Sequence, residues 1–316
     1  ELAQAMAAAQ GMVHDGFAFC QTMPFPQFIQ VAEGLRASGY RPIRFRPYAG
    51  GDRIQVAAVW TRDGRNWQCA QGMTEPELRA QDQARQREGM VPVDVAGYGS
   101  MAGDGAVVYA ALWGEPQSIG LSARLLLGGK AEQDQLQQEG FLPRTCQLLT
   151  QPQGNVQLCG VWEKTSADSE LKWNLDAQTF DTFLTDKQDW DVALSGDRCA
   201  GVWRSSREVG SVALPGVNPE SHLESCRQLA GEGYRPAAIS VTATNDSGGL
   251  LAASIWHRPF VPHEEKLRFA QRQARMAMDY EDGKAMYLRA RQSDRVTMLC
   301  PPPHGMPGDY QIQKLL

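Results

Sequence analysis

Apolar and polar residues follow one another in a recurring order along the chain. Apolar positions three, four and seven residues apart predict one buried helix face at Phe28, Val31, Ala32 and Leu35. A short distance later, apolar residues alternate with arginines from Ile43 to Arg46, the period of two that is typical of a half-buried strand. The pattern therefore predicts a helix followed by strands.

The same order recurs at regular distances. The phrase of glycine, a large apolar residue, any residue and proline begins at Gly39, Gly89, Gly140 and Gly233. Each phrase is followed 21 to 24 residues later by a tryptophan: Trp60, Trp113, Trp162 and Trp256. A fifth tryptophan, Trp203, indicates a repeat whose phrase has decayed near Trp190–Val192. Such periodicity indicates about five tandem repeats.

Each repeat has helix and strand signals in a fixed order. Thr74 and Glu77 form a capping box before a predicted helix, and Gly89 fits the position after its end, where a positive φ favours glycine. Two strands follow, and the second, such as 54–60, is apolar on both faces, as a central strand should be. A third short strand is expected at 67–72. The fold class is therefore α+β, with helix-plus-antiparallel-meander repeats stacked in a curved or closed array.

The predicted array covers residues 1–262, followed by a C-terminal helix and tail at 263–316. Its repeats are expected at about 24–73, 74–124, 125–174, 175–217 and 218–262. We expect the strand at 17–21 to pair with the strand ending at Trp256 and close the array, because an uncovered strand edge favours aggregation. An open arc is the alternative. A β-propeller is a further alternative, but its blades usually lack helices.

Composition excludes several function classes. The net charge is 31 − 36 = −5, which argues against nucleic acid as the main partner. No apolar run of about 18 residues is present, so no membrane span is expected. The chain begins with Glu1 instead of methionine, so we expect a fragment or a processed product.

Several phrases resemble a known family. The segments 39–42, 57–60, 63–67, 94–98 and 254–259 resemble the tandem repeats of a bacterial family found in planctomycetes, over about residues 17–275. Members of that family are attached to serine/threonine protein kinase domains or formylglycine-generating-enzyme-like domains. A related array forms the non-catalytic N-terminal domain of polyglycine hydrolases. The resemblance implies an accessory recognition or scaffolding array. The kinase motifs are absent, so kinase activity is not implied.

Candidate catalytic groups are few. Ser169 and Lys172 match Ser-x-x-Lys, but that chemistry needs both side chains on one helix face, and a strand is expected there. The glycine-rich segment 97–103 is better explained as a hairpin turn than as a dinucleotide loop. His257 and the segment 263–265 could supply metal ligands, but their spacing fits no tetrahedral site, and we expect hydrated surface groups. No catalytic residue, metal site or cofactor is predicted.

Three further groups have alternative explanations. Arg44 and Arg46 could bind an anion, although a solvated strand edge is favoured. The five repeat tryptophans could offer a stacking surface to a ligand, although packing at the end of a buried strand is favoured. Cys146 and Cys159 would oppose one another across a hairpin centred in 151–154, because 146 + 159 = 305. They could form a disulfide in an oxidising compartment or remain a reduced apolar pair.

These observations predict a non-catalytic interaction or scaffold domain that recognises a protein, peptide or cell-envelope partner, or assembles in a larger complex. An extracytoplasmic or cell-envelope location is favoured. The alternative is a hydrolase, or an accessory domain of one, with an undetected site. An enzyme should show convergent polar residues that break the repeat pattern, whereas a scaffold should show contacts shared by several repeats.

Overall fold

The computed structural model describes residues 1–50, 53–99, 106–150, 156–176, 187–206, 208–244 and 249–259. The chain divides into two compact units. The large one contains Glu1–Ser206, Ser211–Ala230 and Tyr234–His257, and the small one contains Arg207–Gly210, Gly231–Gly233 and Arg258–Leu316. Within the small unit, Arg258 Nη1 donates to the backbone oxygen of Glu232 at 3.4 Å. The predicted C-terminal helix and tail, 263–316, lie outside the described residues.

Strands predominate in the described residues, which contain five α-helices. The first repeat comprises α1 (Leu2–Ala8), β1 (Met12–His14), β2 (Phe17–Pro24), a 3-10 turn η1 (Phe25–Gln27), α2 (Phe28–Arg36), β3 (Tyr40–Gly50) and β4 (Arg53–Arg62). The second comprises β5 (Trp67–Met73), α3 (Glu75–Arg87), β6 (Val91–Gly99) and β7 (Val107–Gly114). The third comprises β8 (Ala123–Leu126), α4 (Lys130–Gln138), β9 (Phe141–Pro143), β10 (Gln147–Thr150) and β11 (Val156–Lys164). The fourth comprises β12 (Ser169–Asp176), β13 (Gln188–Ser195) and β14 (Arg198–Arg204), and the fifth comprises β15 (Val209–Val217), α5 (Pro219–Gly231), β16 (Arg235–Ala243) and β17 (Leu250–Pro259).

Each repeat forms its own small antiparallel sheet with the last strand in the middle. The orders are β2-β4-β3, β5-β7-β6, β8-β11-β10, β12-β14-β13 and β15-β17-β16. The strand predicted as the third of one repeat, such as β5, therefore pairs with the repeat that follows it. The predicted boundaries at 73/74 and 217/218 thus separate a first strand from its own helix, and those at 124/125 and 174/175 cut through β8 and β12. Hydrophobic patterns locate strands, but they do not show which central strand each one pairs with.

Local sequence signals explain where the helices of the repeats begin and end. The four phrase glycines, Gly39, Gly89, Gly140 and Gly233, all have φ between +82° and +84°. A side chain would be strained in this left-handed conformation, so the helix or turn ends there and the next strand begins. The predicted helix face is confirmed, because the buried residues of α2 are Phe28, Val31, Ala32 and Leu35. The predicted capping box is also present, and Glu77 Oε2 accepts the backbone N–H of Thr74 at 2.8 Å.

A β-bulge follows the phrase proline in the same place in several repeats. The register shifts between Pro42 and Arg44, between Pro92 and Asp94, and between Pro236 and Ala238. The proline lies opposite the repeat tryptophan, and in the fourth repeat Asp189 takes the place of the proline. All five tryptophans, Trp60, Trp113, Trp162, Trp203 and Trp256, are at most 1% exposed. Each anchors one end of a central strand in the core.

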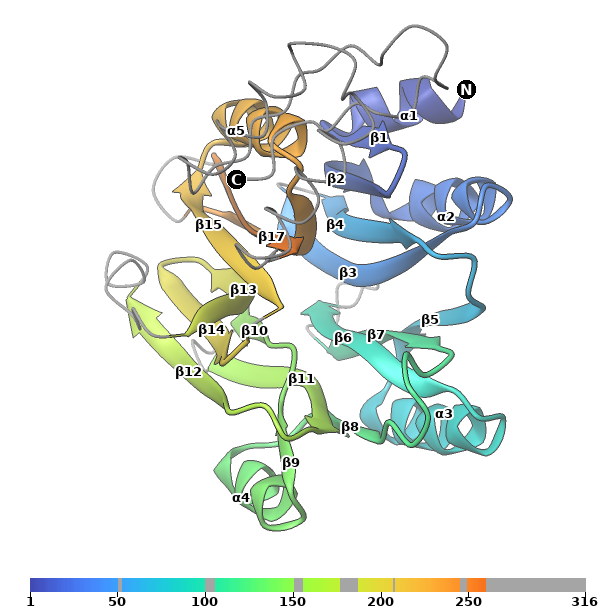
Figure 1. Cartoon of the computed structure of the whole chain (residues 1–316), viewed down its shortest axis with the longest axis vertical. Coiled ribbons are helices and arrows are strands. Elements are labelled where there is room, and N and C mark those ends of the chain that lie inside the picture. The colour runs from blue at the N-terminus through green and yellow to red at the C-terminus, as the bar shows by residue number, and fades with distance from the viewer. Residues whose placement is uncertain are drawn as a thin grey trace, which may run out of the picture. The chain divides into compact units, whose positions relative to one another are not determined.

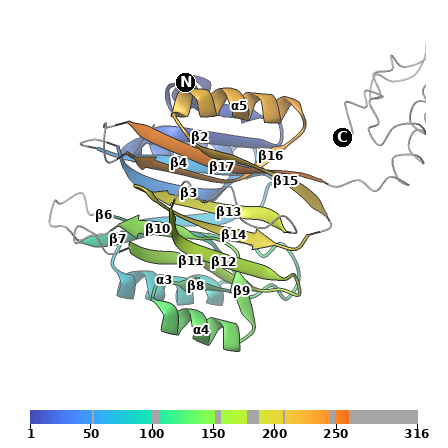
Figure 2. The ribbon, with the colours of Figure 1, turned by 90° about the vertical axis from the view of Figure 1, so that its left-hand side faces the viewer.

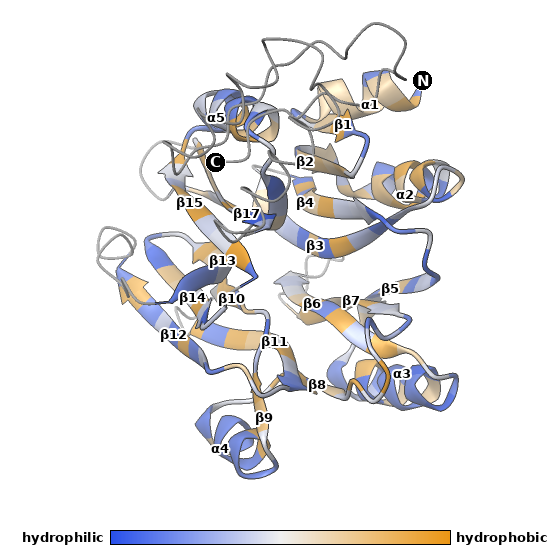
Figure 3. Ribbon diagram, in the orientation of Figure 1, coloured by the Kyte–Doolittle hydropathy of each residue, from blue (hydrophilic) through white to orange (hydrophobic). Residues whose placement is uncertain are grey.

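Within the large unit, the strands that follow the repeat helices contact one another from repeat to repeat. Contacts join β3 to β6, β6 to β10, β10 to β13, β13 to β16 and β16 to β3. Figure 1 shows β3, β6, β10 and β13 toward the middle of the arrangement and the helices α2 to α5 at its periphery. The helices α3 and α4 are largely hydrophilic, whereas hydrophobic and polar residues alternate along the strands (Figure 3). No helix in the described part of the chain is long and apolar enough to span a membrane.

Side chains of one repeat satisfy the backbone of the repeat before it. A strand at the edge of a sheet has unpaired N–H groups that must find partners when buried. At each successive junction, a side chain from the next repeat accepts such an N–H. The bonds run from Phe45 N to Asp94 Oδ2 (2.9 Å), Gly97 N to Gln147 Oε1 (3.0 Å), Cys146 N to Asp191 Oδ2 (2.8 Å) and Leu194 N to Ser240 Oγ (2.8 Å).

The first and last repeats meet through side chains. Strand β2 pairs with β1 and β4, and β17 lies between β15 and β16, so the predicted pairing of 17–21 with the strand ending at Trp256 is wrong. Instead, Phe17 and Phe19 approach the Trp256 ring edge-on, with centroids 5.7 and 5.8 Å away. Figure 2 shows β16 and β17 alongside β2, β3 and β4. Because both edges of β17 are already paired within its own sheet, side-chain contacts join the two repeats instead of strand pairing.

A directed hydrogen-bond chain crosses the same junction. His222 Nδ1 lies 2.6 Å from Gln21 Oε1, and its Nε2 lies 2.8 Å from Ser254 Oγ. The chain continues at its two ends, where Gln21 Nε2 donates to the oxygen of Pro219 at 3.0 Å and Trp256 Nε1 donates to Ser254 Oγ at 2.8 Å. Burial lowers the pKa of His222 to about 4. The imidazole is therefore neutral at pH 7.

Candidate functional site

The arginines predicted on a solvated strand edge are buried. Arg44 and Arg46 are 5% and 3% exposed, and their carboxylate partners come from the second and fourth repeats. Arg44 Nε lies 3.3 Å from Asp191 Oδ1, while Arg46 Nη2 lies 2.9 Å from Asp94 Oδ1 and 3.1 Å from Asp191 Oδ2. The sequence prediction of an exposed edge is wrong because β3 is covered by neighbouring repeats. These four residues are called the central cluster below.

The charges of the central cluster cancel, and its carboxylates bind groups within the protein. It contains two guanidinium groups and two carboxylates, and both carboxylates also accept backbone N–H groups across repeat junctions. Burial by itself would lower the pKa of Arg46. The nearby carboxylates of Asp94 and Asp191 outweigh this effect, so the pKa of Arg46 is raised. Because its partners lie within the protein, the cluster joins three repeats and is not a ligand site.

A second charged group lies between the third and fourth repeats. Arg144 Nη1 and Arg204 Nη1 lie 3.2 and 2.7 Å from the two oxygens of the Glu163 carboxylate. The three side chains are 13%, 8% and 8% exposed, respectively. The Arg204 guanidinium also lies 4.7 Å above the centre of the Trp190 ring. These residues, Arg144, Glu163 and Arg204, are called the Arg–Glu–Arg group below.

The Arg–Glu–Arg group is positively charged overall. Two guanidinium groups share one carboxylate. Burial lowers the pKa of Arg144, Glu163 acts in the opposite direction, and three further arginines add to the lowering: Arg44, Arg204 and Arg41. Within the group, the two guanidinium groups outnumber the single carboxylate.

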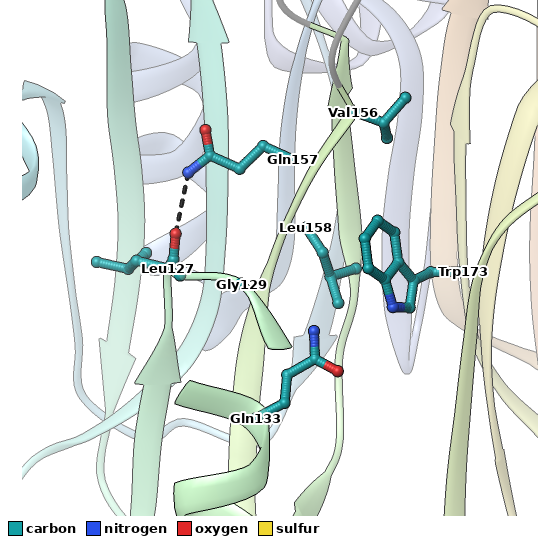
Figure 4. Close-up of a pocket in the computed structure, with 8 residues that line it drawn as sticks. Leu127, Gly129, Gln133, Val156, Gln157, Leu158 and Trp173 are labelled. Carbon is teal, nitrogen blue, oxygen red and sulfur yellow. Dashed lines mark hydrogen bonds between the residues drawn. The ribbon is translucent and has the colours of Figure 1, made fainter. Parts of the chain in front are cut away.

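A pocket with a volume of about 230 Å³ opens beside the third repeat (Figure 4). Its walls are formed by Leu127, Gly128, Gly129, Gln133, Val156, Gln157, Leu158 and Trp173. Figure 4 shows the Trp173 ring beside Leu158, with the Gln133 amide pointing toward both. Gln133 is 6% exposed, and its Nε2 has no hydrogen-bond partner.

The pocket is held by local hydrogen bonds. Gln157 Nε2 donates to the oxygen of Leu127 and to the Tyr109 hydroxyl, both at 2.9 Å. The Glu132 carboxylate accepts the N–H groups of Leu127, at 3.0 Å, and of Gly128, which fixes the loop that precedes α4. The walls contain an aromatic ring, aliphatic side chains and two amides. Among the described residues that line the pocket, none has a carboxylate, imidazole, thiol, hydroxyl or ammonium side chain.

The structure does not assemble the Ser-x-x-Lys motif. Ser169 and Lys172 lie on β12, where residues three apart point to opposite faces. Ser169 Oγ donates to the backbone oxygen of Pro143 at 2.6 Å, and Lys172 Nζ lies 3.3 Å from Glu170 Oε1. Neither arrangement activates the serine.

The possible disulfide is replaced by two buried free thiols. Gln147, not Cys146, lies opposite Cys159, one position away from the predicted register. A shift of one residue turns a side chain to the other face of the sheet, so the two cysteines lie in different core clusters. The offset is already present beside the turn, because Thr150 pairs with Val156 and five residues lie between them, one more than the predicted centre in 151–154 allows.

The histidine predicted at the surface is partly buried. His257 Nε2 lies 2.7 Å from the backbone oxygen of Asp189, and the His257 ring lies 4.9 Å from the Trp190 ring, centroid to centroid. Burial lowers the pKa of His257. In the part of the chain that the structure describes, no three His, Cys, Asp or Glu side chains gather at one point. The segments 263–265 and 100–103 lie outside the described residues.

Three segments of the chain match the family of polyglycine hydrolase-like structural repeats. The matches cover residues 21–63, 64–116 and 209–259. The second and third correspond to the sheets β5-β7-β6 and β15-β17-β16, so the matched repeat begins with the strand before the helix. The third and fourth sheets, between the matched segments, have the same strand order and extend the repeat through the chain. No curated protein matches this chain.

The Arg–Glu–Arg group was missed in the sequence, although a signal was available. Glu163 and Arg204 each follow a repeat tryptophan, where the first and second repeats have Thr61 and Gly114. Two adjacent repeats with opposite charges at one repeat position depart from the pattern, as functional sites often do. The pocket had no comparable signal, because its walls come from a loop, helix α4 and two strands of different repeats.

Proposed function

We propose that the chain is a non-catalytic interaction domain whose repeats form a scaffold and whose pocket beside Trp173 recognises part of a protein or peptide partner. The observation that carries the proposal is the chemistry of the pocket walls, which include no acid, base or nucleophile. An aromatic ring flanked by amides suits an uncharged segment of a partner. At about 230 Å³, the pocket is smaller than most drug-sized sites and fits a single side chain.

The scaffold part of the proposal is supported by the contacts between repeats. The strands that follow the helices contact one another in cyclic order, including β16 with β3. The first and last repeats also share a core that contains Phe17, Phe19, Val59 and Trp256. We propose that the five sheets close into a ring, since a ring leaves no repeat with an uncovered apolar face.

The relation to other repeat proteins supports an accessory role. The matched family is described as a structural repeat. The resemblance of the same segments to planctomycete repeats attached to kinase or formylglycine-generating-enzyme-like domains points in the same direction. A second candidate, an accessory domain that positions a hydrolase, is favoured by the polyglycine hydrolase-like match.

The test compares partner capture by the wild-type chain and by Trp173→Ala. Each protein is immobilised and exposed to extract from the native source, and the captured proteins are quantified. We expect one partner to be depleted at least tenfold with Trp173→Ala, because an interface aromatic anchor is worth about 2 kcal/mol or more. Circular dichroism should show that the variant remains folded.

The matched control is Ile119→Ala. Ile119 is fully exposed and lies outside the pocket, so its removal should leave capture unchanged. Equal capture by the wild type and Trp173→Ala would refute recognition by the pocket. Hydrolysis of peptide or ester substrates by the purified chain, with loss of turnover in Ser169→Ala, would refute the non-catalytic assignment.

A further inference from the structure

One edge of the Arg204 guanidinium has no partner. Arg204 is 7% exposed, and its Nη1 is bound to Glu163, but its Nε and Nη2 have no hydrogen-bond partner. These two nitrogens present parallel N–H groups along the same edge of the planar group. A buried donor without a partner is unfavourable, and more so when it is charged. Two such donors side by side therefore call for an acceptor.

The same edge is filled elsewhere in this protein. Arg41 is 2% exposed, and its Nε and Nη2 bind the Asp63 carboxylate at 2.9 and 2.8 Å. This paired geometry is the usual way in which arginine holds a carboxylate or a phosphate. Arg41 shows what the Arg204 edge lacks, which is a planar or tetrahedral group with two oxygens.

The surroundings of Arg204 favour an anion. The Arg–Glu–Arg group has two positive charges and one negative charge, and the Trp190 ring covers a face of the Arg204 guanidinium. A cation stacked on a ring keeps its edges available for in-plane hydrogen bonds. Arg144 is the most exposed member of the group, at 13%, so the group approaches the surface there.

The positions of these residues are specific to the third and fourth repeats. Arg144 lies at the bulge after a phrase proline, where the first and second repeats have Ile43 and Val93. Glu163 and Arg204 follow repeat tryptophans, where those repeats have Thr61 and Gly114. Packing alone is satisfied by uncharged residues at these positions, so the charges in the later repeats need a separate explanation.

We propose that the Arg204 edge binds an oxyanion that carries two acceptor oxygens, either a carboxylate or a phosphate group. The ligand fills the Nε and Nη2 donors of Arg204 as Asp63 fills those of Arg41. The site is distinct from the Trp173 pocket, whose lining includes none of these residues.

The test is calorimetric titration of the wild-type chain with sodium acetate and with inorganic phosphate, and with chloride at matched ionic strength. We expect saturable binding of acetate or phosphate with no equivalent for chloride. Arg204→Met should weaken binding at least tenfold, because two charge-assisted hydrogen bonds are lost. Arg204→Lys should weaken it similarly, since lysine keeps the charge but has no paired edge. Glu163→Gln should strengthen binding, because it removes the competing carboxylate.

The control is Arg198→Met, which removes a 45% exposed arginine from the same strand and should bind like the wild type. Binding of acetate alone assigns a carboxylate, and binding of phosphate alone assigns a phosphate. The proposal fails if the wild type binds neither anion, if chloride gives the same response, or if the Arg204 variants bind unchanged. If Arg204→Met does not fold, the Arg204→Lys and Glu163→Gln results decide the question.

Discussion

The central cluster and the Arg–Glu–Arg group are both buried, but they differ in charge balance. In the central cluster, Arg44 and Arg46 face Asp94 and Asp191, and both carboxylates also hold backbone N–H groups. In the Arg–Glu–Arg group, two arginines share Glu163, and Arg204 keeps two unpartnered donors on one edge. Arg46 also has an unpartnered Nε, but its Nη2 lies between two carboxylates.

The two groups differ in how completely their buried charges are compensated. A buried charge is stable when each partner is present, and removal of one partner leaves the other uncompensated. The central cluster meets that condition with internal groups, so its residues are needed for folding. The Arg–Glu–Arg group meets it only in part, because Arg204 Nε and Nη2 have no hydrogen-bond partner.

The largest effect is expected from Asp191→Ala. This change removes a carboxylate shared by Arg44 and Arg46 and leaves the Cys146 N–H without its acceptor. The free energy of unfolding should fall by about 3–5 kcal/mol, as for other broken buried ion pairs. Urea denaturation followed by tryptophan fluorescence measures it.

Asp134→Ala is the matched control. Asp134 is 46% exposed and pairs with Lys130 on the surface of α4, so its loss should change stability by less than about 1 kcal/mol. Similar small losses in both variants would show that the central cluster does not hold the repeats together.

An acid titration provides the second prediction, because the His222 imidazole lies at the junction of the first and last repeats. The pKa of His222 is about 4 in the folded chain, below its ordinary value of 6.5. The unfolded chain therefore binds a proton first as the pH falls from 6.5 toward 4. Stability should fall by about 3 kcal/mol over this window and be fully present above it.

The measurement is urea denaturation at several pH values for the wild type and His222→Gln. The variant should lose most of the pH dependence, although His257, whose pKa is also lowered by burial, leaves a remainder. The same measurement on His257→Gln gives the part of the pH dependence that is due to His257. An unchanged slope in His222→Gln would contradict a neutral imidazole at the junction.

The smallest stability effect is expected from Arg204→Met. Glu163 keeps Arg144, and the substitution removes two unpartnered buried donors, so the loss should be below about 1 kcal/mol. Arg46→Met should cost several times more, because it leaves Asp94 and Asp191 underpaired. Equal losses in the two variants under the same denaturation conditions would remove the distinction between the clusters.

Much of the repeat was predictable because its signals are local. The four phrase glycines, the buried face of α2 and the Thr74 capping box depend on neighbours a few residues away, and all are found as expected. The central position of β4 and β7 followed from strands that are apolar on both faces. The partner of a first strand such as β5 did not follow, because pairing links residues separated by a helix and another strand.

The sequence by itself determined the repeat, its turns and the apolar residues that must be buried, because backbone preference and hydrophobic periodicity operate over a few residues. Tertiary structure alone decided the environment of each polar side chain. Arg44 alternates with apolar residues like an exposed arginine, yet β3 is covered by other repeats. Cys146 and Cys159 do not face each other because the connection between Thr150 and Val156 is one residue longer than the sequence arithmetic assumed. Burial of a charge and choice of its partner depend on which strands meet, and those contacts join residues more than a hundred positions apart, such as Arg44 and Asp191.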